Sequence, residues 1–152
     1  MIRLTLPYPI STNRYWRTYV PRGHKLPVTV VSQEAKIYKN TIRKIALQAG
    51  ARLITGRVNI DYVLYPHLPK DWKRRQKLNP DSWDDSVQCI DLDNAQKVLF
   101  DSLEGIAFEN DKLIRRINGE RAMPDGMERV EIIVTPYSRN TGSLNLFSEG
   151  KL

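Results

Sequence analysis

The sequence predicts a mixed α/β (α+β) fold in which two main helices pack on one small mixed β-sheet of about four strands. Three observations lead to this prediction. Segments in which apolar and polar residues alternate, as in half-buried strands, occur near both ends and in the middle of the chain. Two longer amphipathic segments with a helical period separate them. The 152 residues are enough for one core, so we expect a single domain over residues 1–137 with the order strand, helix, strand, helix, strand, strand.

The first strand is predicted at residues 2–6, where alternating apolar residues are followed by two prolines. Residues 7–31 contain four prolines and are expected to be mostly loop. This stretch interleaves aromatic residues with cations, and its Tyr15 and Trp16 allow two interpretations. Either the rings stack on unpaired bases while the cations contact phosphates, or the rings pack beneath a long loop.

The first helix is predicted to begin after Ser32, a favourable N-cap residue, with Glu34 in its first turn. It should end near Ala49, before Gly50. Basic residues occupy much of its surface, which is typical of an ordinary surface helix and would also suit contact with a phosphate backbone. Its apolar stripe is expected to comprise Ile37, Ile42 (or Thr41), Ile45 and Ala49.

The second strand is predicted at residues 58–66, and residues 67–90 after it are polar and charged. A loop of this length is unusual in a compact domain, which indicates either function or disorder. The first half of the loop is basic and the second half is acidic. Two interpretations follow: the two ends pair with each other, or the segment is a flap that contacts a substrate.

The second helix is predicted to begin at Asp91 or at the residue after it and to end near Gly105. A third strand is expected at residues 113–120 and a fourth at residues 130–134. Residues 138–152 are small and polar without a period, and we expect a flexible, loosely held tail there. The buried face of the second helix is expected to consist of Leu92, Ala95, Leu99, Leu103 and Ile106.

The charge is strongly uneven along the chain. The net charge is +7, yet residues 1–57 alone contain eleven Lys or Arg and one acid, while nine acids lie between residues 81 and 111. A basic half beside an acidic segment suits a protein that grips phosphates with one surface and binds metal with another. A solvated basic surface without a partner is the alternative.

The composition argues against several classes of protein. No apolar run approaches the roughly 20 residues that span a bilayer, and the first residues lack the apolar core of a signal peptide. Cys89 is the only cysteine, so we expect no intrachain disulfide and a cytoplasmic location. With one Cys and two His, any metal should be a hard cation held by oxygen ligands. The chain has no Gly-rich phosphate loop, so we expect no nucleotide cofactor.

The most informative motif is Asp-Leu-Asp-Asn at residues 91–94, followed by Lys97 one helical turn later and by Asp111. Two carboxylates at the start of a helix can converge on one divalent cation, and Lys97 lies on the same face as Asp93. A strand running back beside the helix could bring Asp111 near them. Three Asp and one Lys are a common set for Mg²⁺-assisted phosphodiester hydrolysis. In the alternative, the first two aspartates only cap the helix, and Asp101 is expected to be a salt-bridge partner rather than a ligand.

These motifs resemble the RusA family of Holliday junction resolvases, small endonucleases of bacteria and prophages. The resemblance covers most of residues 1–135. Compact members have a short arginine-rich link before the acidic motif, whereas residues 67–90 are long, so we do not carry over the family's cleavage-sequence preference. The resemblance rests on Leu6-Pro7-Tyr8-Pro9 with Ser11, Asn13, Arg14 and Tyr15, on Val31-Ser32 with Glu34 and Tyr38, and on Asp91-Leu92-Asp93-Asn94 with Lys97, Phe100-Asp101, Leu103 and Asp111.

The resemblance implies a RusA-like homodimer, bacterial or prophage-encoded, that binds four-way DNA junctions and makes paired nicks with Mg²⁺, or Mn²⁺ in its place, as cofactor. It implies that Lys97 is the essential lysine and that the metal ligands are Asp91, Asp93 and Asp111. Two other functions stay open, a non-catalytic module that binds branched DNA and a nuclease directed at RNA. The residues expected to contact DNA are Asn13, Arg14, Arg17, Lys36, Lys39, Arg43, Lys73, Arg74, Arg75 and Asn94.

Overall fold

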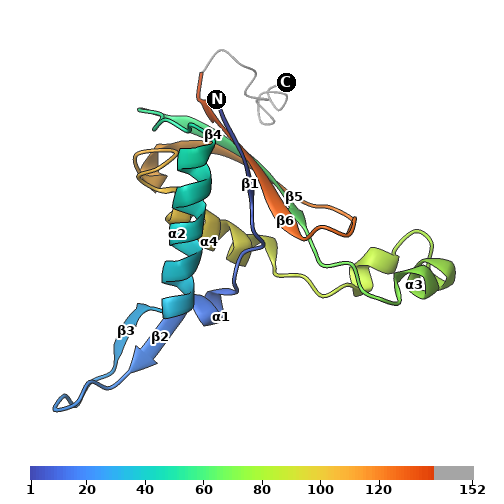
Figure 1. Ribbon diagram of the computed structural model, residues 1–152, viewed down its shortest axis with the longest axis horizontal. Helices are drawn as coiled ribbons and strands as arrows, with labels where there is room; N and C mark the ends of the chain where they lie inside the picture. Colours follow the sequence, from blue (N-terminus) through green and yellow to red (C-terminus); the bar gives the residue numbers. More distant parts are fainter. Residues whose placement is uncertain (139–152) are drawn as a thin grey trace, which may run out of the picture.

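The computed structural model describes residues 1–138 and has the predicted α/β architecture (Figure 1). Its main sheet comprises four strands, β1 (Ile2–Leu6), β4 (Val58–Tyr65), β5 (Ile114–Arg121) and β6 (Arg129–Pro136). Their order is β1-β6-β4-β5, with β5 parallel to β4 and β6 antiparallel to both of its neighbours. The tail expected over residues 138–152 lies, apart from Ser138, outside the described residues.

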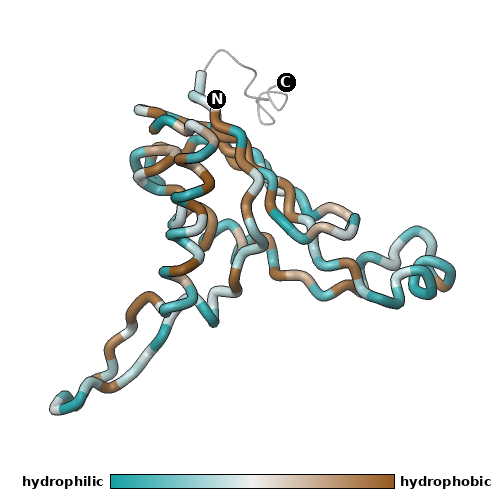
Figure 2. Tube along the Cα trace, viewed as in Figure 1, coloured by the Kyte–Doolittle hydropathy of each residue, from teal (hydrophilic) through white to brown (hydrophobic). Residues whose placement is uncertain are grey.

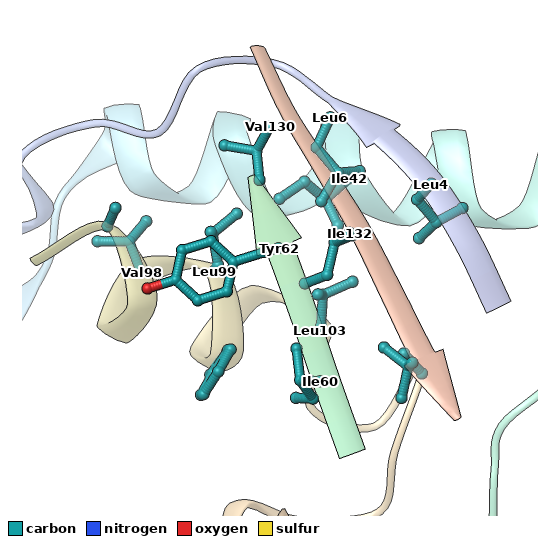
Figure 3. Packing of buried hydrophobic residues seen from close by; sticks show 14 of the residues in the cluster. Leu4, Leu6, Ile42, Ile60, Tyr62, Val98, Leu99, Leu103, Val130 and Ile132 are labelled. Carbon is teal, nitrogen blue, oxygen red and sulfur yellow. The ribbon is translucent and has the colours of Figure 1, made fainter. Parts of the chain in front are cut away.

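Two helices, α2 (Gln33–Gln48) and α4 (Leu92–Leu103), lie on one face of this sheet. In β1, in β4 and in β6 as far as Val134, every second residue is buried, as expected for strands with one covered face. Figure 3 shows these side chains directed into the space between the sheet and the two helices. Burying one such aliphatic side chain contributes roughly 1.5–3 kcal/mol. The fully buried aliphatic residues of these strands are Leu6, Val58, Ile60, Leu64, Val130, Ile132 and Val134.

The ends of α2 agree with the prediction, but its buried face differs. The Ser32 hydroxyl accepts a hydrogen bond from the Ala35 amide at 3.1 Å, and Gly50 follows the helix with a φ of +69°. Ile37 is 58% exposed, and Ala49 is also exposed. The prediction was right for Ile42, which is buried, and Ile45 packs against the core. It failed for the other two positions because small alanines on the inner face let α4 and β1 approach closely. That face consists of Ala35, Tyr38, Ile42 and Ala46.

Helix α4 connects β4 to the parallel strand β5, and its limits are close to those predicted. It ends at Leu103, and Gly105 follows with a φ of +77°. A connection between parallel strands must return the chain to the end where the first strand began. The last turn of α4 therefore leads toward the start of β5, where Ile114 pairs with Val58. Among residues 1–138, no helix is long and apolar enough to cross a membrane.

Residues 7–31 are about half loop, as predicted, but they also contain regular structure that was not predicted. They form a short helix, α1 (Thr12–Tyr15), and an antiparallel hairpin of β2 (Trp16–Tyr19) and β3 (Val28–Val31), which projects from the core (Figure 1). Each strand has four residues, and every residue of β2 is exposed, so neither strand has the buried alternating face on which the prediction relied. Figure 2 shows hydrophobic and hydrophilic segments interspersed along this arm.

Residues 67–90 also contain regular structure that was not predicted, and we call this segment the α3 lobe. It comprises α3 (Trp72–Leu78) and a 3₁₀ turn, η1 (Trp83–Ser86). The ring centroids of Trp72 and Trp83 lie 6.2 Å apart, and Trp83 is buried. The lobe extends away from the hairpin (Figure 1) and is largely hydrophilic (Figure 2). With only seven residues, α3 is too short to give a reliable periodic signal.

Two arginines hold the α3 lobe together and fasten it to the sheet. The Arg75 guanidinium donates to the Ser86 carbonyl oxygen at 2.9 Å, which joins α3 to η1. Arg121 of β5 donates to the carbonyl oxygens of Asp84 at 3.0 Å and Val87 at 2.8 Å. The two halves of the segment therefore contact each other, but through the tryptophan pair and a carbonyl oxygen rather than through pairing of their opposite charges.

The first turn of α4 is held on the sheet by one tyrosine. The Tyr62 hydroxyl lies 3.3 Å from Leu92 O and 3.2 Å from Gln96 Oε1, and Figure 3 shows its oxygen directed toward α4. Gly119 lies beside Tyr62 on β5, and a Cβ atom there would lie 2.5 Å from the Tyr62 hydroxyl. Glycine is therefore required at this position so that the ring can cross β5 and reach the helix.

We expect Gly119→Ala to lower the free energy of unfolding by about 1–3 kcal/mol, the usual cost of overpacking a core. The added methyl group must displace the Tyr62 ring from its contacts with Leu92 and Gln96. Urea denaturation measures the change, and Asn118→Ala, at an exposed position of the same strand, is the matched control. Equal stability of the two variants would contradict this account of Gly119.

Two further tyrosines fix the segments that flank the core. Tyr38 of α2 donates to Pro7 O at 2.9 Å. The Tyr8 hydroxyl accepts from the Ile90 amide at 2.8 Å and contacts Cys89 Sγ at 3.5 Å. Burial raises the pKa of both phenols, that of Tyr8 to about 12. Tyr8 thereby joins the segment after β1 to the residues immediately before α4.

We expect the protein to lose stability as the pH rises from about 10 to 12. Over this range the unfolded chain ionises its tyrosines near pH 10, whereas folded Tyr8 stays protonated up to about 12. The native state then binds more protons than the unfolded state, so the free energy of unfolding falls with pH. Tyr8→Phe should flatten this decline in pH-dependent urea denaturation. Tyr19→Phe, which removes an exposed phenol, is the control, and identical slopes for both variants would refute the assignment.

Candidate active site

Asp91 occupies the N-cap position of α4 but does not cap the helix with its side chain. Its backbone is extended, with φ −63° and ψ 144°, and its carbonyl accepts the Ala95 amide at 2.9 Å. Its carboxylate makes no capping hydrogen bond. Asp93 lies in the first turn, and within residues 1–138 it has neither a hydrogen-bond partner nor an ion-pair partner. Both carboxylates are exposed, so the helix dipole favours their charge without engaging their oxygens.

A cavity of about 340 Å³ runs along the exposed side of α4. Asp93 and Lys97 contribute to it from successive turns of the helix, as their spacing predicted. Asp111, the first residue of the 3₁₀ turn η2 (Asp111–Leu113), also lines it. The structure therefore brings three of the four predicted catalytic residues to one cavity.

Asp91 lies outside that cavity and lines a neighbouring groove of about 860 Å³. Asn94 and Arg14 line the same groove, which extends to residues of the α3 lobe. The Thr12 hydroxyl lies 2.5 Å from Asn94 Oδ1. Because Thr12 lines the cavity and Asn94 lines the groove, this hydrogen bond marks the border between the two. Asp91 and Asp93 thus face two adjoining depressions.

The carboxylate oxygens of the three aspartates are the type of ligand that a hard divalent cation prefers. However, among residues 1–138 no three Asp, Glu, His or Cys side chains are grouped closely enough to hold an ion. The expectation that a strand running back beside the helix would bring Asp111 to the first two carboxylates is therefore not met. Asp111 precedes β5, and the start of β5 pairs with the start of β4, whereas Tyr62 near the other end of β4 contacts the first turn of α4.

Asp101 forms an ion pair, as the sequence predicted, although its side chain lines the same cavity as Asp93 and Asp111. Its Oδ2 lies 2.7 Å from Lys39 Nζ, in an ion pair between α4 and α2. The Lys39 ammonium also lies 5.4 Å from the centroid of the Tyr15 ring. Lys39, expected to contact DNA, is therefore engaged within the protein and has only a third of its side chain exposed.

The other residues expected to contact DNA fall into two groups. Arg14 forms a bidentate ion pair with Glu34, and Arg75 is held by Asp71 and by Ser86. Their guanidinium groups are thus partly used within the protein. The exposed candidates that form no ion pair within residues 1–138 are Asn13, Arg17, Lys36, Arg43, Lys73 and Arg74.

The cavity also contains residues to which the sequence gave no catalytic role. The sequence gives Tyr15 and Trp16 the same interpretation, but their burial differs in the structure. Tyr15 is 2% exposed and Trp16 is 42% exposed. Both line the cavity because α1 turns the chain toward α4 just before β2 begins. The only sequence signal for this was the interleaving of aromatic residues with cations. Other lining residues that sequence analysis missed are Thr12, Gln96 and Glu104.

Comparison with known proteins adds one finding. A family model described as endodeoxyribonuclease RusA matches residues 7–135, which include the cavity, the adjoining groove, the hairpin and the α3 lobe. No curated protein matches the chain.

Proposed function

The chain belongs to the RusA family of endodeoxyribonucleases, and from that premise we propose that it is a structure-selective nuclease that resolves four-way DNA junctions. It would act as a homodimer and make paired, symmetric nicks, because two incisions on a two-fold substrate require two active sites. The observation that carries the proposal is the cavity in which Asp93, Lys97 and Asp111 meet within the matched range.

We propose that Asp91, Asp93 and Asp111 hold divalent cations, Mg²⁺ or alternatively Mn²⁺. Such an ion activates water and stabilises the leaving oxygen in phosphodiester hydrolysis. Within residues 1–138, Asp91 makes no capping bond and Asp93 makes no ion pair. This supports the role, because both carboxylates keep their oxygens available. Asp111 is included because it lines the same cavity as Asp93, whereas Asp101, which also lines that cavity, is already paired with Lys39.

Lys97 supplies the positive charge in this scheme. It is exposed, one turn after Asp93, and forms no ion pair within residues 1–138. An ammonium group at this place can bind a non-bridging oxygen of the scissile phosphate and stabilise the charge that develops there during hydrolysis. Asn94, held by Thr12 at the border of the cavity, would position the neighbouring backbone.

Two surfaces are proposed to hold the DNA backbone. The first is the basic region around the hairpin and α2, with Asn13, Arg17, Lys36 and Arg43; Arg14 and Lys39 adjoin it. The second is the outer face of α3, where Lys73, Arg74 and Lys77 are exposed, while Arg75 faces the body of the lobe. Positions 73 and 77 are one helical turn apart, so their ammonium groups lie on the same side. A four-way junction has several duplex arms, and two separate basic surfaces suit contact with more than one of them.

We expect Asp93→Asn to lower the rate of junction cleavage at least about a hundredfold, on the scale of losing one electrostatic contact in a transition state. Junction binding should be unchanged or tighter, because a repelling charge is removed. The assay uses a labelled synthetic four-way junction with Mg²⁺, beside linear duplex DNA and an RNA junction. Glu120→Gln, which neutralises an exposed acid on β5, is the control.

Normal nicking by Asp93→Asn would refute the assignment of this site. Binding without cleavage by the wild-type protein at any Mg²⁺ concentration would instead support the non-catalytic DNA-binding module. The absence of a group of three carboxylates among residues 1–138 is the observation that favours this alternative. Preferential cleavage of the RNA junction would identify an RNA-directed nuclease.

We expect the triple variant Lys73→Gln/Arg74→Gln/Lys77→Gln to weaken junction binding and to reduce the salt dependence of the affinity. Each lost phosphate contact should lower the slope of log K against log salt by about 0.9. Arg3→Gln/Arg52→Gln/Arg57→Gln removes the same net charge from exposed positions outside both proposed surfaces and is the matched control. If both triple variants change the slope equally, α3 contributes only general charge and makes no contact of its own.

A further inference from the structure

Trp16 is an exposed aromatic residue at the edge of a charged cavity. It is 42% exposed and lines the cavity together with Asp93, Lys97 and Asp111. The exposed part of the indole, beside carboxylates and an ammonium, contributes nothing to the stability of the fold, because that part of its surface is not removed from water. Its placement therefore calls for a partner outside the chain.

The Trp16 side chain is held in place by its surroundings. It is the first residue of β2, and its backbone pairs with Val31 of β3. Its ring packs on the Tyr15 ring with the centroids 5.0 Å apart and an interplanar angle of 73°, an edge-to-face contact. Tyr15 is buried and lies beneath the Lys39 ammonium, so the support is itself fixed. A ring fixed on one side and open on another is preorganised to bind a flat ligand.

We propose that Trp16 stacks on a nucleobase that has left its own base stack, adjacent to the phosphate bound at Lys97. This inference rests on the proposed nuclease function and specifies its substrate. Bases within a continuous duplex are stacked on their neighbours and present only their edges, so an aromatic side chain can stack only on an unstacked base. At the branch point of DNA the stack of each arm ends, so a base there can expose one face when the arms do not stack on each other. The cavity would therefore select the nucleotide at the branch and place the adjoining phosphate beside Lys97.

Tyr19, the other exposed aromatic residue of β2, serves as a control position for Trp16. Tyr19 is 43% exposed, nearly the same fraction as Trp16, but it does not line the cavity. An odd separation of three residues along a strand places the two side chains on opposite faces. If any exposed ring bound DNA non-specifically, substitution of Trp16 and substitution of Tyr19 would weaken DNA binding alike. Stacking beside the cleavage site would instead depend on Trp16 alone.

Photo-crosslinking tests the proposal without requiring cleavage. A four-way junction carrying 5-iodouracil at the branch point is irradiated in complex with the Asp93→Asn protein, and the crosslinked residue is mapped by mass spectrometry. We expect a crosslink at Trp16 that is lost in Trp16→Ala and retained in Tyr19→Ala. A crosslink that persists in Trp16→Ala, or that is equally strong with 5-iodouracil within a duplex arm, would overturn the proposal.

Binding affinity provides the second measurement. Trp16→Ala should weaken junction binding roughly ten- to a hundredfold, the range for loss of one base–aromatic stack, while affinity for linear duplex stays within about twofold. Trp16→Phe retains a ring that can pack on Tyr15 and should recover most of the affinity, which excludes misfolding as the cause. Equal loss on junction and duplex, or a changed oligomeric state in size-exclusion chromatography, would assign Trp16 to a structural or dimer contact and refute the proposal. Because these measurements use binding alone, a failure of the nuclease assignment would be seen separately in the cleavage assay.

Discussion

The packing of α4 on the parallel pair β4–β5 is the constraint on which the rest of the structure depends. Tyr62 makes this packing possible, because its ring passes over Gly119 and its hydroxyl reaches the first turn of the helix. That turn carries Asp93, and Asp91 is its N-cap residue. A side chain at position 119 would move the ring, and the acidic motif would lose its support from the sheet. The candidate site is thus positioned by the core rather than by a loop.

The same arrangement explains why the acidic residues do not form one cluster. A helix that joins two parallel strands runs against their direction, so its two ends lie toward opposite ends of the sheet. With 12 residues, α4 is about 18 Å long. Asp93 lies in the first turn of the helix, and Asp111 comes after its last turn. The two residues line one cavity that runs along the helix. Asp91 faces the adjoining groove because successive residues at the start of a helix point in different directions.

Two arms extend from this core, and both are stabilised mainly by local contacts. The β2–β3 hairpin has exposed side chains along all of β2, and the α3 lobe is built around one pair of tryptophans and the Arg75 contacts. Neither arm contributes residues to the main hydrophobic core beyond Tyr15 and Val31 at the base of the hairpin and residues 89–90 at the end of the lobe. Surfaces of this kind can vary without unfolding the sheet and helices, which suits them to contact with an extended polyanion. The uneven charge of the sequence agrees with this division, since the basic N-terminal part includes the hairpin.

The sequence by itself determined the features that depend on near neighbours in the chain. Ser32, Gly50 and Gly105 marked helix ends because capping and a positive φ are local requirements. Alternation located the buried strands, and the motif at residues 91–94 led to the family. Only the tertiary structure decided which side of α2 is buried, and that Trp16 is exposed while Tyr15 is buried. It also decided that Asp93 shares a cavity with Asp111 but not with Asp91. The physical reason is that these relations depend on how α1 and α4 dock against other elements, and no periodic pattern within a segment encodes the partner against which it packs.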